Sequence, residues 1–226
     1  MRAIRATFAS LCVAALCACG QTDAPEPAGP PQAVEIEAPS GVYTLDPNHS
    51  SVLVRATHFG LSQYTLRMTG VSGTLNFNAE DPAQSSVNAI VDATSVATAY
   101  QGQRSFDEEL QNSEWLDAAT HPTISFQSTD VELTGSNTGR MTGDLTIRGV
   151  THPITLDVTF NQGYRLHPMG APVALLGFSA HGTFRRSDYG MRVLLQPAGG
   201  IGVSDEVDVI IEAEFSQPAA PAEAVN

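Results

Sequence analysis

The sequence predicts an all-β protein: one antiparallel barrel of eight strands, with a single short helix in a long insertion between two of them. Three observations lead to this fold class. Apolar and polar residues alternate with a period of two through most of residues 41–217, turn-forming residues separate the alternating runs, and one segment departs from the pattern. A run with one apolar and one polar face is typical of a half-buried antiparallel strand.

Eight alternating runs supply the strands of this barrel. Eight strands suit an up-and-down barrel whose interior is just wide enough for side chains or for one small ligand, and a sandwich is the rival architecture. The runs begin with Val52, Val71, Val87, Ile124, Met141, Ile154, Leu176 and Val207. Small residues on the inward faces favour a barrel with spare room, and these are Ala56, Gly73, Ala89, Gly143, Ala180 and Gly182.

The insertion covers residues 95–120 and contains the helix. Ser105 and Glu108 have the spacing of a capping box, which predicts a helix start at this point. Phe106, Leu110 and Trp115 would share one side of the segment. An insertion of this length is either a lid across the mouth of the barrel or a plug that completes the core.

Composition limits the kinds of partner. The 226 residues are 42% hydrophobic, which is enough for the core of one domain, and their formal net charge is −13. Such an acidic chain lacks the basic surface that nucleic acids and anionic membranes attract, so no nucleic acid is expected as a partner. All three cysteines lie within the first 19 residues, so the barrel is expected to have no disulfide, no thiolate nucleophile and no cysteine metal ligand.

The first 18 residues are predicted to form a lipoprotein signal peptide. Arg2 and Arg5 give a positive start, and residues 6–18 form a mostly apolar run that is too short to span a bilayer as a helix. The run ends in Leu16-Cys17-Ala18-Cys19, which is similar to the bacterial lipobox, where the last cysteine is acylated and becomes the mature N-terminus. An ordinary secretory leader, with Cys19 incidental, is the alternative.

Lipidation of Cys19 would anchor the chain to a membrane of the cell envelope. Gly20 follows Cys19, whereas an aspartate at this position commonly retains such proteins in the inner membrane. The similarity therefore implies the periplasmic face of the outer membrane. Residues 19–40 are predicted as a lipidated N-terminus with a Pro/Ala-rich linker, and residues 218–226 as a disordered tail, because neither has the apolar periodicity needed to bury a core.

The sequence offers no catalytic constellation. It contains no GxSxG, P-loop or HExxH motif, and its six histidines are scattered without metal-ligand spacing. We therefore expect a binding protein, not an enzyme, with no metal and no cofactor apart from a bound lipid. His58 continues the inward face of Val52 and Val54, where it is either a satisfied structural residue or a contact for a polar head group. Arg148 and Arg186 are the other head-group candidates, because a guanidinium binds anionic groups through paired donors.

Several ordered motifs resemble the YceI-like family over about residues 43–215. They are the segments 43–52 (YTLDPNHSSV), 58–62 (HFGLS), 143–153 (GDLTIRGVTHP), 177–180 (GFSA), 186–190 (RSDYG) and 202–207 (GVSDEV). The resemblance implies a YceI-like, lipocalin-like barrel domain over residues 41–217, with an apolar interior that holds an isoprenoid chain such as a polyprenyl lipid or an isoprenoid quinone. It further implies export to the periplasm, no established enzymatic activity and a homodimer as one possible assembly.

The insertion departs from the family pattern. Where the family usually reads Arg-Asp-x-His-Leu and then Phe-Phe-Asp, this chain has residues 106–110 (FDEEL) and 115–117 (WLD). The arginine and the histidine are missing from their places, although Arg104 is close. If those family residues contact a ligand head group, that contact is in question in this chain.

The sequence thus predicts an exported, lipid-anchored protein that binds a polyisoprenoid or an isoprenoid quinone inside the barrel. The alternative is a structural or stress-response lipoprotein whose barrel is filled by its own side chains and which acts through its surface. The residues predicted to contact the lipid are Val52, Val54, His58, Leu75, Phe77, Val91, Phe106, Leu110, Trp115, Phe126, Leu145, Ile147, Leu156, Phe178, Phe184 and Ile211.

Overall fold

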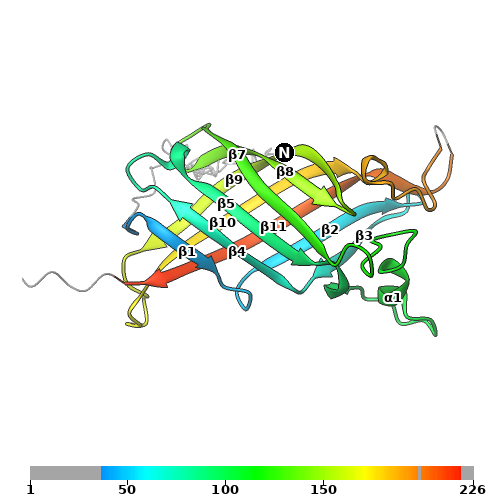
Figure 1. Ribbon diagram of the computed structural model, residues 1–226, viewed down its shortest axis with the longest axis horizontal. Helices are drawn as coiled ribbons and strands as arrows, with labels where there is room; N and C mark the ends of the chain where they lie inside the picture. The colour runs from blue at the N-terminus through cyan, green and yellow to red at the C-terminus, as the bar shows by residue number, and fades with distance from the viewer. Residues whose placement is uncertain (1–36, 198–199, 220–226) are drawn as a thin grey trace, which may run out of the picture. The chain divides into compact units, whose positions relative to one another are not determined.

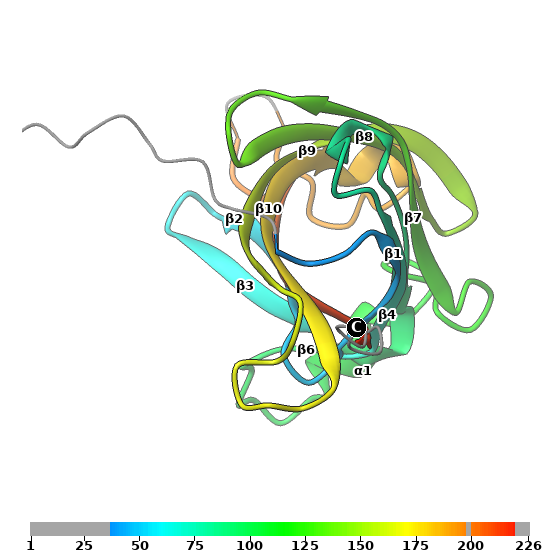
Figure 2. The same cartoon turned by 90° about the vertical axis from the view of Figure 1, so that its left-hand side faces the viewer.

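The alternating runs form one antiparallel sheet that closes on itself into a barrel (Figures 1 and 2). The computed structural model describes residues 37–197 and 200–219. Its strands are β1 (Gly41–Leu45), β2 (Ser51–His58), β3 (Ser62–Met68), β4 (Val71–Phe77), β5 (Ser86–Asp92), β6 (Val96–Ala97), β7 (Thr123–Leu133), β8 (Thr138–Ile147), β9 (Val150–Tyr164), β10 (Val173–Arg185) and β11 (Val203–Pro218). The helical elements are η1 (Pro82–Gln84), η2 (Ala93–Ser95), α1 (Phe106–Leu110) and η3 (Arg186–Tyr189). The predicted signal peptide, Cys19 and most of the linker and tail lie outside the described residues.

Eight strands close the barrel in the order β1, β4, β5, β7, β8, β9, β10 and β11, and β11 pairs again with β1. The other three strands continue these beyond a break: β2 extends β1, β3 extends β4, and β6 extends β5. The long strand β11 pairs with β1 near Phe215 and with β2 from Val203 to Glu212. The predicted antiparallel barrel of eight strands is confirmed, with three of its strands interrupted.

The interruptions lie side by side across the first three barrel strands, and we call them the seam. They fall at residues 46–50, 69–70 and 93–95. Side chains and backbone groups cross the seam: the backbone N–H of Thr69 donates to the carbonyl of Ser95 (3.1 Å), and Arg67 donates to the carbonyl of Ser50 (3.3 Å). The seam is therefore held by single hydrogen bonds where an unbroken sheet would have a continuous ladder.

Two tight hairpins at one end of the barrel use residues with positive φ. Phe59 (φ 53°) and Gly60 (φ 71°) connect β2 to β3, while Arg148 (φ 52°) and Gly149 (φ 72°) connect β8 to β9. Two successive positive φ values define the type I′ turn, whose twist matches that of the flanking strands. Glycine adopts this conformation without strain, whereas Phe59 and Arg148 are held in it against their preference.

The insertion between β6 and β7 lies at the same end (Figure 1). Its short helix α1 begins where the capping residue predicts, because the Ser105 side chain accepts a hydrogen bond from the backbone N–H of Glu108 (3.3 Å). Arg148 ties the insertion to the β8–β9 hairpin by donating to the carbonyls of Trp115 and Ser113, both at 2.9 Å. Among the described residues, no helix has the length and apolar character needed to cross a membrane.

Candidate functional site

Much of the end of the barrel opposite the insertion, where β1 pairs with β4, is filled by the protein's own side chains. Tyr43 and Ala174 are fully buried there and Leu176 is 1% exposed. The rings of Tyr43 and Phe77 meet edge to face, with centroids 6.2 Å apart, and the Tyr43 hydroxyl donates to the carbonyl of Pro39 (2.7 Å). We call this cluster the packed end; its buried members are Ala38, Tyr43, Leu45, Leu75, Phe77, Phe160, Ala174, Leu176, Ala213 and Phe215.

The packed end includes a residue that the sequence assigns to the linker. Ala38 is 2% exposed and belongs to the same cluster. The packed domain therefore begins a few residues before Gly41, because the chain entering β1 covers that end of the barrel.

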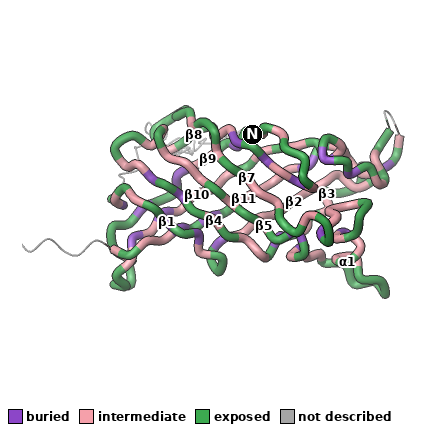
Figure 3. The backbone as a smooth tube through the Cα atoms, viewed as in Figure 1, coloured by how far each residue is buried: buried purple, intermediate pink, exposed green. Residues whose placement is uncertain are grey.

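The middle of the barrel is hollow. Inward-facing residues are only partly buried there, and β2 has intermediate burial along its whole length (Figure 3). The reason is a cavity of about 630 Å³, which these side chains border instead of packing against each other. Ligand sites for small molecules usually measure about 300–1,000 Å³, so this space is large enough for an extended lipid chain.

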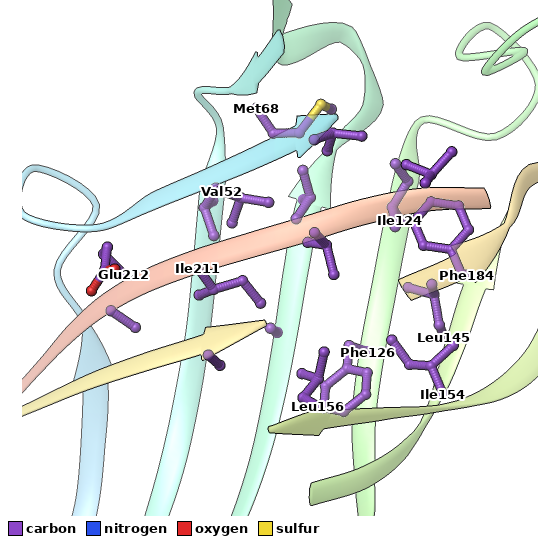
Figure 4. Close-up of a pocket in the computed structure, with 18 of the residues that line it drawn as sticks. Val52, Met68, Ile124, Phe126, Leu145, Ile154, Leu156, Phe184, Ile211 and Glu212 are labelled. Carbon is purple, nitrogen blue, oxygen red and sulfur yellow. The ribbon is translucent and has the colours of Figure 1, made fainter. Parts of the chain in front are cut away.

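Apolar side chains from opposite walls of the barrel point into this cavity (Figure 4). Val52 and Ile211 lie on one side, and Phe126, Leu145 and Leu156 lie on the other. Oxygen and nitrogen atoms are rare between them, so the central wall has little to offer a polar ligand. An interior of this composition binds by excluding water from an apolar molecule.

Every residue predicted to contact the lipid lies on the wall of this cavity. The alternation of the strands explains this result, since alternate side chains of a barrel strand point inward. The structure also adds lining residues that the sequence interpretation did not select: Leu45, Leu66, Met68, Val87, Val96, Tyr100, Arg104, Ile154, Val158, Phe160, Val207 and Val209.

The insertion both borders the cavity and completes a core. Phe106, Leu110 and Trp115 line the cavity, and Leu110 is buried in one cluster with Met68 and Val96. The two readings of the insertion, lid and plug, are therefore both correct in part: it is packed against the barrel wall on one side and borders the hollow on the other.

Small residues on the inward faces have two different roles. Ala89 and Ala180 line the cavity and leave room in it. Gly143 does not line the cavity, and a Cβ at this position would lie 2.6 Å from the carbonyl oxygen of Gln127 and 2.3 Å from the Phe126 ring. Gly143 is thus required for the close approach of β7 and β8, and the expectation that it provides space for a ligand is wrong.

One group of polar side chains of the cavity wall lies beneath the insertion. The ring of His58 lies 4.2 Å from that of Phe59 and 6.2 Å from that of Tyr64, measured between centroids. The hydroxyl of Tyr64 is buried and has no hydrogen-bond partner among the described residues. Arg104 forms an ion pair with Glu109, so its charge is compensated within the insertion. This end of the cavity therefore offers an imidazole, a phenol hydroxyl and a paired cation.

Arg186 lines the cavity but is occupied by the protein itself. It is 3% exposed and donates to the backbone carbonyls of Met191, Val193, Val203 and Ser204, at 2.8–3.1 Å. Burial lowers the pKa of Arg186, partly opposed by the charge of Asp205. Only one of the five guanidinium N–H groups has no partner in these bonds, so Arg186 fixes the connection between η3 and β11 and is a poor candidate for a head-group contact.

Arg148 is not part of the cavity wall. Its guanidinium donates to the carbonyls of Trp115 and Ser113, and its side chain braces the insertion from outside. This position does not support the expectation that Arg148 meets a head group inside the cavity. Nearby, Asp205 accepts hydrogen bonds from Ser187 (2.8 and 2.9 Å) and pairs with Arg185 (3.4 Å).

The cavity wall reaches exposed residues at both ends of the barrel. Beneath the insertion these are Tyr100, Arg104 and Leu194, and at the opposite end they are Leu133 and the polar hairpin residues 135–140. Within the described part of the chain, no group of three or more histidine, cysteine, aspartate or glutamate side chains could hold a metal ion.

Comparisons with known proteins agree with this architecture. The model of the YceI-like domain family matches residues 43–215. Protein YceI of Escherichia coli is 34% identical over 177 residues, which cover 77% of this chain and 86% of that protein.

Two solved structures share the fold. BcnA of Burkholderia cenocepacia has a TM-score of 0.63 at 20% identity and covers 75% of this chain and 98% of its own. A domain of Saccharophagus degradans, described as polyisoprenoid binding, has a TM-score of 0.56 at 15% identity and covers 78% of this chain and 98% of its own. The eight-stranded barrel, the family match across nearly all of it and the similarity to Protein YceI show that the chain belongs to the YceI-like domain family.

Proposed function

We propose that this chain is an exported, lipid-anchored binding protein whose barrel holds one long apolar lipid, either a polyisoprenoid or an isoprenoid quinone. The observation that carries the proposal is the cavity of about 630 Å³ between the packed end and the insertion, with its apolar wall. An apolar cavity is stabilised by an apolar occupant, because each Å² of apolar surface removed from water contributes about 25 cal/mol.

The ligand class is supported by the shape of the cavity and by similarity to a domain with the same fold. A long, narrow lipid suits a space bounded by the walls of a barrel, and few polar groups are needed to orient it. The Saccharophagus domain with the same fold is described as polyisoprenoid binding. Binding fits the wall, since its central side chains are apolar and act by excluding water from a ligand.

The experiment that tests the ligand is extraction. Protein purified from its native envelope is extracted with organic solvent, and the extract is analysed by mass spectrometry. A prenyl species at about one molecule per chain is expected. A clean extract would favour the alternative, a barrel that acts only through its surface.

A matched pair of variants ties the retained lipid to the cavity. Ala180→Leu places a larger side chain in the cavity, whereas Thr183→Leu places the same side chain on the exposed face of the same strand. We expect Ala180→Leu to lose the extracted lipid and Thr183→Leu to keep it. Equal lipid content in both variants would contradict binding in the barrel.

The anchor and the location are part of the proposal and have their own test. Cys19 ends a lipobox-like segment, and two acyl chains hold a protein on a membrane where one gives only marginal binding. Metabolic labelling with a fatty acid is expected to mark the wild-type chain and not Cys19→Ser. Equal labelling of both would refute lipidation at Cys19. A homodimer stays a prediction, and sedimentation of the purified chain tests it.

A further inference from the structure

Four large apolar side chains are exposed at the insertion end of the barrel. Phe59 is 38% exposed, Leu61 83%, Leu194 58% and Ile201 80%. They come from two loops that meet, because the backbone N–H of Phe59 donates to the carbonyl of Gly202 (2.8 Å). We call these four residues the apolar rim.

The apolar rim is continuous with the cavity. Leu194 belongs both to the rim and to the cavity wall, and the ring of Phe59 lies against that of the lining residue His58. Exposed apolar residues occur at the opposite end too, such as Leu166 (51%) and Met169 (87%), but these do not line the cavity. At the opposite opening one exposed apolar residue, Leu133 (52%), lines the cavity beside the polar hairpin residues 135–140, whereas the rim gathers four exposed apolar side chains at its opening.

The backbone holds two rim residues in a conformation that they do not favour. Phe59 (φ 53°) and Leu194 (φ 51°) are both in the left-handed region, where bulky residues are genuine outliers. An asparagine or glycine would fit either position with less strain, and neither would expose apolar surface. Such strain is concentrated at sites that serve binding.

The charges of the two loops point to the kind of partner. In a chain with a formal net charge of −13, residues 59–61 and 190–202 contain no aspartate or glutamate. Their one charged residue is Arg192, which is exposed. Such loops can approach lipid phosphates without repulsion, and a single cation suits a neutral lipid surface better than a strongly anionic one.

We propose that the apolar rim docks on the surface of a lipid bilayer and that lipid passes between bilayer and cavity at this end. The proposal rests on the proposed function, since a lipid-binding barrel must take its ligand from a membrane. Apolar side chains at the tips of loops enter the boundary between head groups and acyl chains, and the energy of this step scales with the apolar area buried. The polar hairpin at the other opening then faces water.

The first test asks which end enters the bilayer. An environment-sensitive fluorophore is attached at Leu61→Cys or, as a control, at Met169→Cys, in full-length chains whose three native cysteines are replaced by serine. Both chains are mixed with phosphatidylcholine vesicles that carry a lipid-borne quencher. We expect a blue shift and quenching at position 61 and neither at position 169. No change at position 61, or equal changes at both, would overturn the proposal.

The second test separates docking from binding. Leu61→Ser combined with Ile201→Ser removes apolar rim area but changes no residue of the cavity wall; Met169→Ser is the control. A fluorescent polyprenol is delivered either from phosphatidylcholine vesicles or from cyclodextrin. Loss of two exposed leucine-sized contacts should slow uptake from vesicles about tenfold or more and leave uptake from cyclodextrin unchanged. Unchanged uptake from vesicles would refute docking, whereas no uptake by the wild type from either source would refute the proposed function itself.

Discussion

The two halves of the barrel interior are built from the same strands and packed in opposite ways. On β10, Ala174 is fully buried at the packed end, whereas Ala180, on the same face six residues later, borders the cavity. On β11, Phe215 is 5% exposed, and Ile211 is only partly buried. An inward position in a barrel is therefore not equivalent to a core position, because what lies across the barrel decides whether the side chain finds partners.

The half of the barrel that contains the cavity is held together by polar interactions. Arg186 satisfies four backbone carbonyls, Arg148 holds the insertion, and Asp205 holds η3 through Ser187. The packed half relies on interlocked aromatic and aliphatic side chains. The packed half therefore contributes mainly to stability, and the other half provides the space for binding.

The largest expected effect comes from matched truncations. Leu176→Ala removes a side chain that is 1% exposed at the packed end, and we expect a loss of about 2–5 kcal/mol of unfolding free energy, because a cavity is created. Leu66→Ala, at the cavity wall, should cost about 1 kcal/mol, since it only enlarges an existing space. Urea denaturation of both variants measures the two values. Equal losses would show that the hollow is filled in solution by the protein's own side chains.

A smaller effect is expected from adding volume to β10. Ala174→Leu should destabilise the chain by about 1–3 kcal/mol through overpacking. Ala180→Leu, in the cavity, should change the unfolding free energy of the lipid-free protein by less than about 1 kcal/mol. Thermal unfolding of both proteins after delipidation makes the comparison. The contrast disappears if Ala180→Leu is as destabilising as Ala174→Leu.

The smallest expected effect is the pH dependence of the stability that Asp205 contributes beside the cavity. Burial works against ionisation of Asp205, but hydrogen bonds from Ser187 and the charges of Arg185 and Arg186 outweigh it, so the pKa of Asp205 is lowered. A carboxyl with a lowered folded pKa contributes stability above its unfolded value of about 3.9 and loses it as pH falls through the folded value. Asp205→Asn should therefore destabilise the chain at pH 7 and have little effect near pH 3. A destabilisation that does not depend on pH would mean that hydrogen bonding alone matters there.

Much of the fold follows from the alternation of side chains. Parity along each strand places Val52, Phe126 and Leu156 on the inward face, and the cavity wall contains all of them. The alternation does not show that Leu176 is buried and Ile211 only partly buried, because both are large aliphatic residues in the same pattern. Which of them is packed depends on contacts across the barrel between segments far apart in the sequence.

The differences between the predicted site and the folded one have the same physical origin. Arg148 and Arg186 have the donors that an anionic head group needs, but carbonyls from distant loops use those donors in the folded chain. Gly143 is small and inward-facing, yet its smallness serves the contact with Gln127 on the neighbouring strand. A signal for the Gly143 role existed in the sequence, since a glycine inside a strand often marks a close approach of two backbones.

The seam has a mechanical consequence. A barrel closed by unbroken ladders resists any change of girth, because every strand must slide against its neighbours at once. Here three adjacent strands are interrupted at one level, where bonds such as those from Thr69 to Ser95 and from Arg67 to Ser50 join neighbouring strands. On this side the ladder that would oppose a change of girth is interrupted, whereas the long strands β7 to β11 continue through this level.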